Sequence, residues 1–152
     1  MRALVIATLI CCLAGCGSEP SAPAPSGSKV DQAKLAKAKA AYTAFLDEAV
    51  KGADLLASHP DGDKLEEQIK KLQGLLDQAS DVYPDHKRMS EVAMDCKGMI
   101  RYFSASLSTI KYHAKSKAPI SESVKKRIDE VSDKNADAVR KTVDRTRTEM
   151  GP

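Results

Sequence analysis

Three histidines are the side chains in this 152-residue chain with the widest chemical repertoire, because imidazole can bind metals and transfer protons. His59 follows one predicted helix and His113 lies near the end of another, so an up-and-down bundle would place both at the same end, with His86 at the opposite end. Zinc usually takes three or four protein ligands, and no HExxH or CxxC motif completes a site. We therefore expect no metal site, and His59 and His113 remain the candidates for an alternative function as a small-ligand or metal-binding bundle.

Four cysteines suggest thiol chemistry, but only one falls within the predicted folded part. Cys11 and Cys12 belong to an N-terminal apolar run, and Cys16 lies just after it. Cys96 is on the apolar face of a predicted helix, and free cysteine is among the most buried residue types. We expect Cys96 to be a small buried hydrophobe, since a redox or dimer-forming thiol would need exposure and a lowered pKa.

The N-terminus has the pattern of a secretory signal. Arg2 precedes an apolar run over residues 3–14, which ends in small residues. About twenty apolar residues are needed to span a bilayer, so this run is too short for a permanent transmembrane helix.

The end of this run, Leu13-Ala14-Gly15-Cys16, resembles the lipobox of bacterial lipoproteins at every position. The resemblance implies that Cys16 receives a thioether-linked diacylglycerol, with acyl chains such as palmitate, and that residues 1–15 are cleaved. Two alternatives stay open: a plain signal peptide cleaved near Gly15, and a shifted box at Leu9-Ile10-Cys11-Cys12, in which Cys11 fits the small-residue position less well. Gly17 rather than Asp follows Cys16, which in such lipoproteins favours the outer membrane, facing the periplasm, over the inner membrane.

Processing at Cys16 would divide the chain into three parts. Residues 1–15 are the predicted signal peptide, residues 16–28 the lipidated cysteine with a flexible Pro/Ser tether, and residues 29–152 a helical bundle domain. The prolines of the tether favour polyproline II, while Gly and Ser keep its ends flexible. At about 3.1 Å per residue, the tether could hold the folded part up to roughly 35 Å from the membrane.

From residue 29 onward, apolar residues recur at alternating steps of three and four, as in amphipathic helices and coiled coils. Breaks at 58–62, 84–85 and 118–119 divide this region into four predicted helices. The predicted N-terminal caps or starts are Ser28, Asp63, Asp85, and Ser121 or Pro119. In the last helix the predicted seam is Ile120, Val124, Ile128, Val131, Ala138 and Val139, thinning to Thr142, Val143, Thr146 and Met150, with Asn135 inside it.

Short connections between long helices predict an all-α fold, an antiparallel up-down-up-down four-helix bundle. Residues 61–85 carry a net charge of −4 and residues 86–118 carry +5, so the second and third helices should attract each other as neighbours. Because the last seam is the weakest, a three-helix bundle with a loosely attached fourth helix is the alternative.

No motif supports catalysis or a cofactor. The chain has no Gly-rich phosphate loop, no G-x-S-x-G elbow, and no Cys-x-x-Cys-His for covalent haem. Its net charge of +3 is too small to indicate a nucleic-acid partner, and the basic clusters of residues 119–152 alternate with acidic residues. We expect a non-enzymatic envelope lipoprotein that contacts the membrane through its lipid and binds an envelope protein or polymer, or supports structure.

Overall fold

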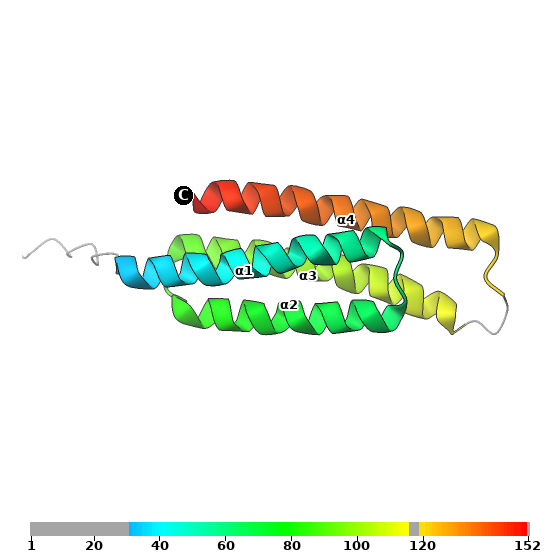
Figure 1. Cartoon of the computed structure of the whole chain (residues 1–152), viewed down its shortest axis with the longest axis horizontal. Coiled ribbons are helices and arrows are strands. Elements are labelled where there is room, and N and C mark those ends of the chain that lie inside the picture. Colours follow the sequence, from blue (N-terminus) through cyan, green and yellow to red (C-terminus); the bar gives the residue numbers. More distant parts are fainter. Residues whose placement is uncertain (1–30, 116–118, 152) are drawn as a thin grey trace, which may run out of the picture. The chain divides into compact units, whose positions relative to one another are not determined.

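A computed structural model describes residues 31–115 and 119–151, which belong to a folded unit bounded as Asp31–Pro152. All regular secondary structure in these ranges is helical, as predicted, and the four helices form a four-helix bundle (Figure 1). They are α1 (Gln32–Ala57), α2 (Gly62–Val82), α3 (Lys87–Ala114) and α4 (Glu122–Met150). The predicted signal peptide, the predicted lipidation site Cys16 and the predicted tether lie outside the described residues.

Each helix begins at a side chain that accepts a hydrogen bond from the backbone N–H three residues later, which satisfies one of the free donors of the first turn. The capping residues, in chain order, are Asp31, Asp61, His86 and Ser121. The cap at Ser121 was predicted, and the structure confirms it. The described helices are all too polar or too short in their apolar stretches to cross a bilayer.

Three predicted caps were wrong by one to three residues. Asp31 rather than Ser28 caps α1, and Asp61 rather than Asp63 caps α2. At the start of α3 the imidazole of His86 takes the place predicted for Asp85. The reason is conformational, since a cap must have extended backbone while the following residues are helical. All of these candidates have suitable side chains, but only one per helix is the last extended residue.

In the bundle, α1 and α3 are diagonally opposite each other and close enough to make contact. Helix α1 contacts α2, α3 and α4, whereas α2 and α4 make no contact with each other among the described residues. Ion pairs between α1 and α4 join Asp47 to Arg147 and Asp54 to Arg140, so residue numbers rise along one helix as they fall along the other.

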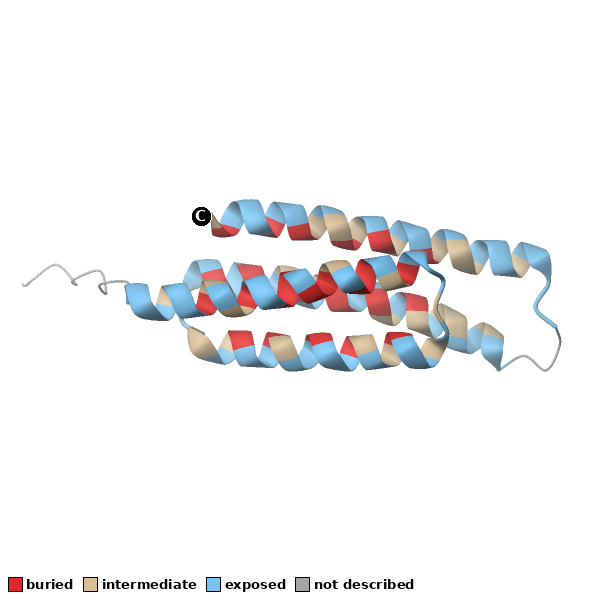
Figure 2. Cartoon of the chain, in the orientation of Figure 1, coloured by how far each residue is buried: buried red, intermediate tan, exposed pale blue. Residues whose placement is uncertain are grey.

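The core lies where the apolar stripes of the four helices meet, as the buried residues in Figure 2 show. In α1, the buried residues other than Glu48 form one stripe at steps of three and four: Ala38, Tyr42, Phe45, Leu46, Ala49, Gly52, Ala53 and Leu56. The first half of α4 differs from the prediction. The buried residues of α4 as a whole are Ser132, Ala136, Val139, Val143, Thr146 and Met150.

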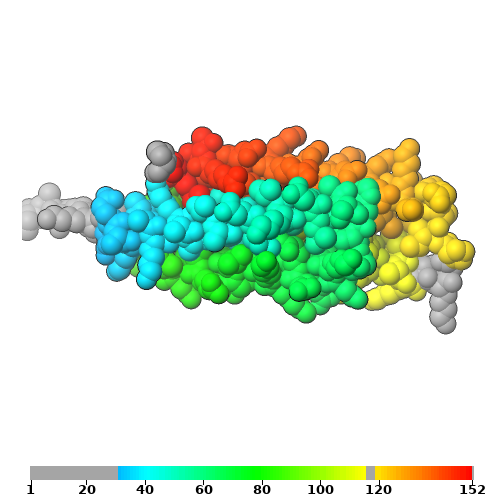
Figure 3. Space-filling model, in the orientation of Figure 1, coloured from blue at the N-terminus to red at the C-terminus, as the bar shows by residue number. Residues whose placement is uncertain are grey.

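The reason for the change in α4 is the unequal length of the helices. The end of α3 and the start of α4 extend beyond α1 and α2, so the first turns of α4 have little beside them except α3 (Figure 3). Val124, Ile128 and Val131 are consequently only half-buried, and Ile120 is 47% exposed. In the first half of α4, the residues of the predicted seam therefore lie on the flank that faces α3.

Ion pairs attach α4 to two other helices. Arg140 and Arg147 contact carboxylates of α1, and Arg145 contacts Asp95 of α3 at 2.6 Å. The alternative of a loosely attached fourth helix is therefore not what the structure shows. The helices of opposite charge, α2 and α3, are neighbours as predicted, and Glu66 pairs with Lys111 between them.

Candidate functional site

His59 lies in the connection between α1 and α2, in an uncommon backbone conformation. Its φ is +52°, in the left-handed region that costs most side chains energy, although histidine is among the residues that tolerate it better. The backbone N–H of His59 donates to the carbonyl oxygen of Leu56 at 3.0 Å, which closes the last turn of α1. This conformation directs the chain from α1 into the cap of α2.

The imidazole of His59 lies between two carboxylates of α4. Its Nε2 is 3.2 Å from Oδ1 of Asp133, and its Nδ1 is 3.7 Å from Oδ1 of Asp129. The two nitrogens therefore face different acidic groups, one on each edge of the ring. A metal would need these groups to converge on one point, whereas here the ring joins the α1–α2 connection to α4 through two separate contacts.

His113 and His86 have other roles. The ring of His113 packs edge-on against Tyr112, with the ring centroids 5.1 Å apart. His86 caps α3 and packs against Tyr83 at 4.9 Å. Within residues 31–115 and 119–151, no three His, Cys, Asp or Glu side chains are placed to hold a metal ion. The two candidate histidines, His59 and His113, thus have separate partners.

The thiol of Cys96 is fully buried, as the sequence predicts. Burial, with a smaller contribution from the neighbouring charge of Asp95, raises the pKa of Cys96 to about 12. A thiol is a nucleophile only as its thiolate, so Cys96 is unreactive at neutral pH in the folded chain. Cys96 therefore contributes packing to the core.

A buried carboxylate at the α1–α2 interface was missed in the sequence. The side chain of Glu48 is only 8% exposed, and it lies 2.8 Å from Nζ of Lys71 and 3.3 Å from Nζ of Lys51. Gln68 donates to both its carboxylate and its backbone carbonyl. The only signal in the sequence is that Glu48 falls between the buried Phe45 and Ala49. With three donors around it, the carboxylate has a structural role rather than that of a free base.

A second polar group joins α3 to α4. Asp95 accepts from Arg145 at 2.6 Å and from the buried hydroxyl of Thr146 at 3.0 Å. Further along, the side-chain amide of Asn135 donates to the hydroxyl of Ser106, which is fully buried, at 2.8 Å. Every buried side-chain polar atom of the described residues has a partner. These groups hold the helices together and leave no polar atom aimed into an empty space.

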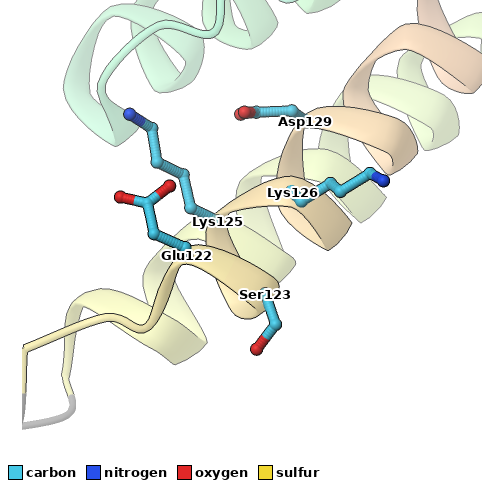
Figure 4. A pocket seen from close by; sticks show the side chains of 5 residues that line it. All are labelled: Glu122, Ser123, Lys125, Lys126 and Asp129. Carbon is cyan, nitrogen blue, oxygen red and sulfur yellow. The ribbon is translucent and has the colours of Figure 1, made fainter.

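Three of the surface hollows are open and lined mainly by charged side chains, whereas a fourth, beside the α2–α3 connection, is lined mostly by uncharged residues that include Tyr42, Tyr83 and Met89. Figure 4 shows one at the start of α4, where Lys125 and Glu122 lie side by side while Ser123 and Lys126 point in other directions. Such side chains do not converge on a common point, as the polar groups of a ligand pocket do.

Comparison of the chain with family models, with curated proteins and with solved structures found no match. The function therefore has to be argued from the residues themselves.

Proposed function

We propose that this chain is a lipid-anchored bacterial envelope protein that binds another envelope component and carries out no catalysis. The observation that carries the proposal is the segment Leu13-Ala14-Gly15-Cys16, which follows a short apolar run and precedes a Pro/Ser-rich stretch. Two or more acyl chains give durable attachment to a membrane. A tether between anchor and fold is useful when a protein must reach something at a distance from the bilayer.

The proposed architecture is an antiparallel up-down-up-down bundle that occupies residues 29–152, after a cleaved leader (1–15) and a tether (16–28). It is supported by the opposed numbering of the ion pairs between α1 and α4, and by the pairing of Asp95 with Arg145 between α3 and α4. Location in the outer membrane, facing the periplasm, is proposed because Gly17 follows Cys16.

A binding or structural role is favoured over an enzyme by how the polar side chains are used. Glu48, Asp95 and Asn135 are each held by partners on a neighbouring helix. The alternative of a metal- or ligand-binding bundle would use His59 and His113, whose rings contact different residues. This alternative comes second and would be supported by a thermal shift with zinc or copper.

Substitution of Cys16 tests the anchor. Cys16→Ala should abolish incorporation of labelled palmitate and release the chain from the membrane fraction, because the sulfur is the only proposed acceptor of the lipid. Cys96→Ala, which removes a buried thiol instead, is the matched control and should leave both readouts unchanged. Cys12→Ala should also leave labelling intact, unless the shifted box is the one used.

Mass spectrometry of the mature N-terminus completes the test. A mature chain that begins at an unmodified residue near Gly15, or a Cys16→Ala chain that still carries labelled acyl groups, would overturn the proposal. Lipidation together with loss of the leader is the expected result.

A further inference from the structure

A row of uncharged side chains faces outward along α3, and we call it the outer α3 stripe. Its members are Met94, Gly98, Tyr102, Ala105, Thr109 and Tyr112. They are separated by steps of three and four residues, so they lie on one face of the helix. Three of them are large and exposed, with Met94 at 69%, Tyr102 at 39% and Tyr112 at 76%. A row of this kind is typical of a helix face that packs against another element.

Contacts on both sides of α3 establish that this stripe points to solvent. Asp95 and Ser106 contact α4, while Lys111 contacts Glu66 of α2, so these residues mark the two sides of α3 that are already occupied. The outer α3 stripe lies between these sides, opposite the buried Cys96 and Phe103.

The middle of the stripe is open to close approach. A Cβ placed on Gly98 would have no neighbouring atom within 4 Å. Ala105, seven residues further along, is also small and exposed. Small residues one heptad apart allow a second helix to approach the backbone of α3 closely.

Positive charges border the stripe on both sides. Lys97 and Arg101 lie along its α2 side, while Arg127, Lys134 and Arg145 lie on the neighbouring part of α4. All five are exposed. Acidic residues also lie near the stripe. At its Met94 end a hollow is lined by Glu91, Met94, Asp95, Arg145 and Glu149. In that hollow Arg145 contacts both Asp95 and Glu149. On α4 the exposed Glu130 lies between Arg127 and Lys134 in the sequence.

We propose that the outer α3 stripe and its bordering cations form a docking surface for an acidic amphipathic helix of another protein. The apolar face of that helix would pack over Gly98, Tyr102 and Ala105, and its acidic flanks would lie against the two rows of cations. The inference rests on the proposed binding function and deepens it by naming the chemistry of the partner.

A second copy of this chain fits the surface less well. Pairing of two α3 helices would place Arg101 and Lys97 of one copy against the same cations of the other, which is unfavourable. The outward residues of α2 have the complementary charge, with Asp63, Glu67, Asp77 and Asp81 all exposed. They include no apolar side chain to cover Met94 and Tyr102, so an acidic helix with its own apolar face is the better match.

Two synthetic helical peptides of about 21 residues test the proposal. One has leucine along one face and glutamate on both flanks, and the other has lysine in place of glutamate. Fluorescence anisotropy measures their binding to the full chain carrying Cys16→Ala. We expect the acidic peptide to bind at least about tenfold more tightly than the basic one, because several bordering pairs of opposite charge attract the first and pairs of like charge repel the second.

Variants of the chain locate the binding surface. Arg101→Glu combined with Lys134→Glu should weaken binding of the acidic peptide by about tenfold or more, while Lys70→Glu on the outer face of α2 should change it less than twofold. Gly98→Gln should block the close approach, and Gly74→Gln is its matched control because a Cβ there also meets nothing within 4 Å. Circular dichroism verifies that each variant remains helical.

Three outcomes would overturn the proposal. The first is equal binding of both peptides, or equal effects of the α3 variants and their α2 controls. The second is self-association in sedimentation that Gly98→Gln abolishes, which would make the face a homodimer interface. The third is binding to phosphatidylglycerol vesicles, but not to the peptide, that is lost on Arg101→Glu. These readouts are independent of the labelling and fractionation of Cys16, so this proposal and the anchor proposal can fail separately.

Discussion

The ring of Phe103 from α3 lies close against α1 at Gly52, and substitution of this glycine by alanine tests that packing. A Cβ at Gly52 would lie 2.8 Å from Cζ and 2.9 Å from Cε1 of Phe103, and 3.1 Å from Nε2 of Gln68. Phe103 is fully buried, so its rigid ring has no open space to move into. The amide of Gln68 is held by Glu48, and a shift of that amide would strain both hydrogen bonds.

Two opposing effects set the size of the change at Gly52. Alanine favours the helix over glycine by about 1 kcal/mol. Overpacking of a filled core costs about 1–3 kcal/mol, and weakening the hydrogen bonds of Gln68 adds about 1 kcal/mol. We therefore expect Gly52→Ala to lower the free energy of unfolding by about 1–3 kcal/mol.

Urea denaturation followed by circular dichroism measures this change, with Gly74→Ala as the matched control. Gly74 is also within a helix, but a Cβ there meets nothing within 4 Å. The control should therefore gain about 0.5–1 kcal/mol. In a chain that already carries Phe103→Leu, the penalty of Gly52→Ala should fall, because Cζ and Cε1 of Phe103 are gone while Nε2 of Gln68 remains.

Close packing at Gly52 is refuted if Gly52→Ala stabilises the chain as much as Gly74→Ala does. It is also refuted if Phe103→Leu leaves the penalty at Gly52 unchanged, since the two effects would then be independent. Either result would mean that α1 and α3 lie farther apart than the structure has them.

Three further predictions concern buried groups. Cys96 should react with a thiol reagent at pH 8 only as fast as the chain unfolds, and addition of urea should accelerate the reaction, because burial raises its pKa to about 12. Burial alone would raise the pKa of Glu48, but hydrogen bonds from Lys71, Gln68 and Lys51 outweigh that effect and hold it below its usual value. The ionised Glu48 therefore contributes stability above pH 4.5, and this stability is lost as the pH falls through the lowered pKa of the folded chain. In urea titrations, Glu48→Gln should cost about 1–2 kcal/mol at pH 7 and less near pH 3. Asn135→Ala should destabilise the chain by about 1–2 kcal/mol because the hydroxyl of Ser106 loses its partner. Adding Ser106→Ala should then cost little more. Additive losses in this double-mutant cycle would contradict the hydrogen bond.

Most of the helical organisation could be predicted because it depends on local patterns. The turn residues at 58–62 separate α1 from α2, and the heptad spacing from Ala38 to Leu56 marks the buried face of α1. The burial of Cys96 follows from the same spacing in α3. Local spacing is enough in these cases because each stripe has helices on both sides, so every apolar position on it becomes covered.

The candidate site could be predicted only in part. The histidines were recognised as potential ligands, but their partners come from distant parts of the chain, such as Asp133 for His59 and the N–H of Met89 for His86. Glu48 was missed because its burial depends on Gln68 and Lys71 of another helix. Its position between Phe45 and Ala49 is the one local signal, and an exposed acidic residue beside an apolar stripe can have the same position.

We could predict four amphipathic helices, the breaks between them and a lipobox-like segment before a proline-rich stretch, because all of these depend on residues close together in the chain. The packing of the helices settles which flank of α4 is buried, which carboxylates pair with Arg145 and Arg147, and that the outer α3 stripe stays uncovered. The physical reason is that burial and charge pairing depend on what lies opposite a side chain. In this bundle the neighbours are set by the unequal lengths of the helices and by the close diagonal approach of α1 to α3 at Gly52.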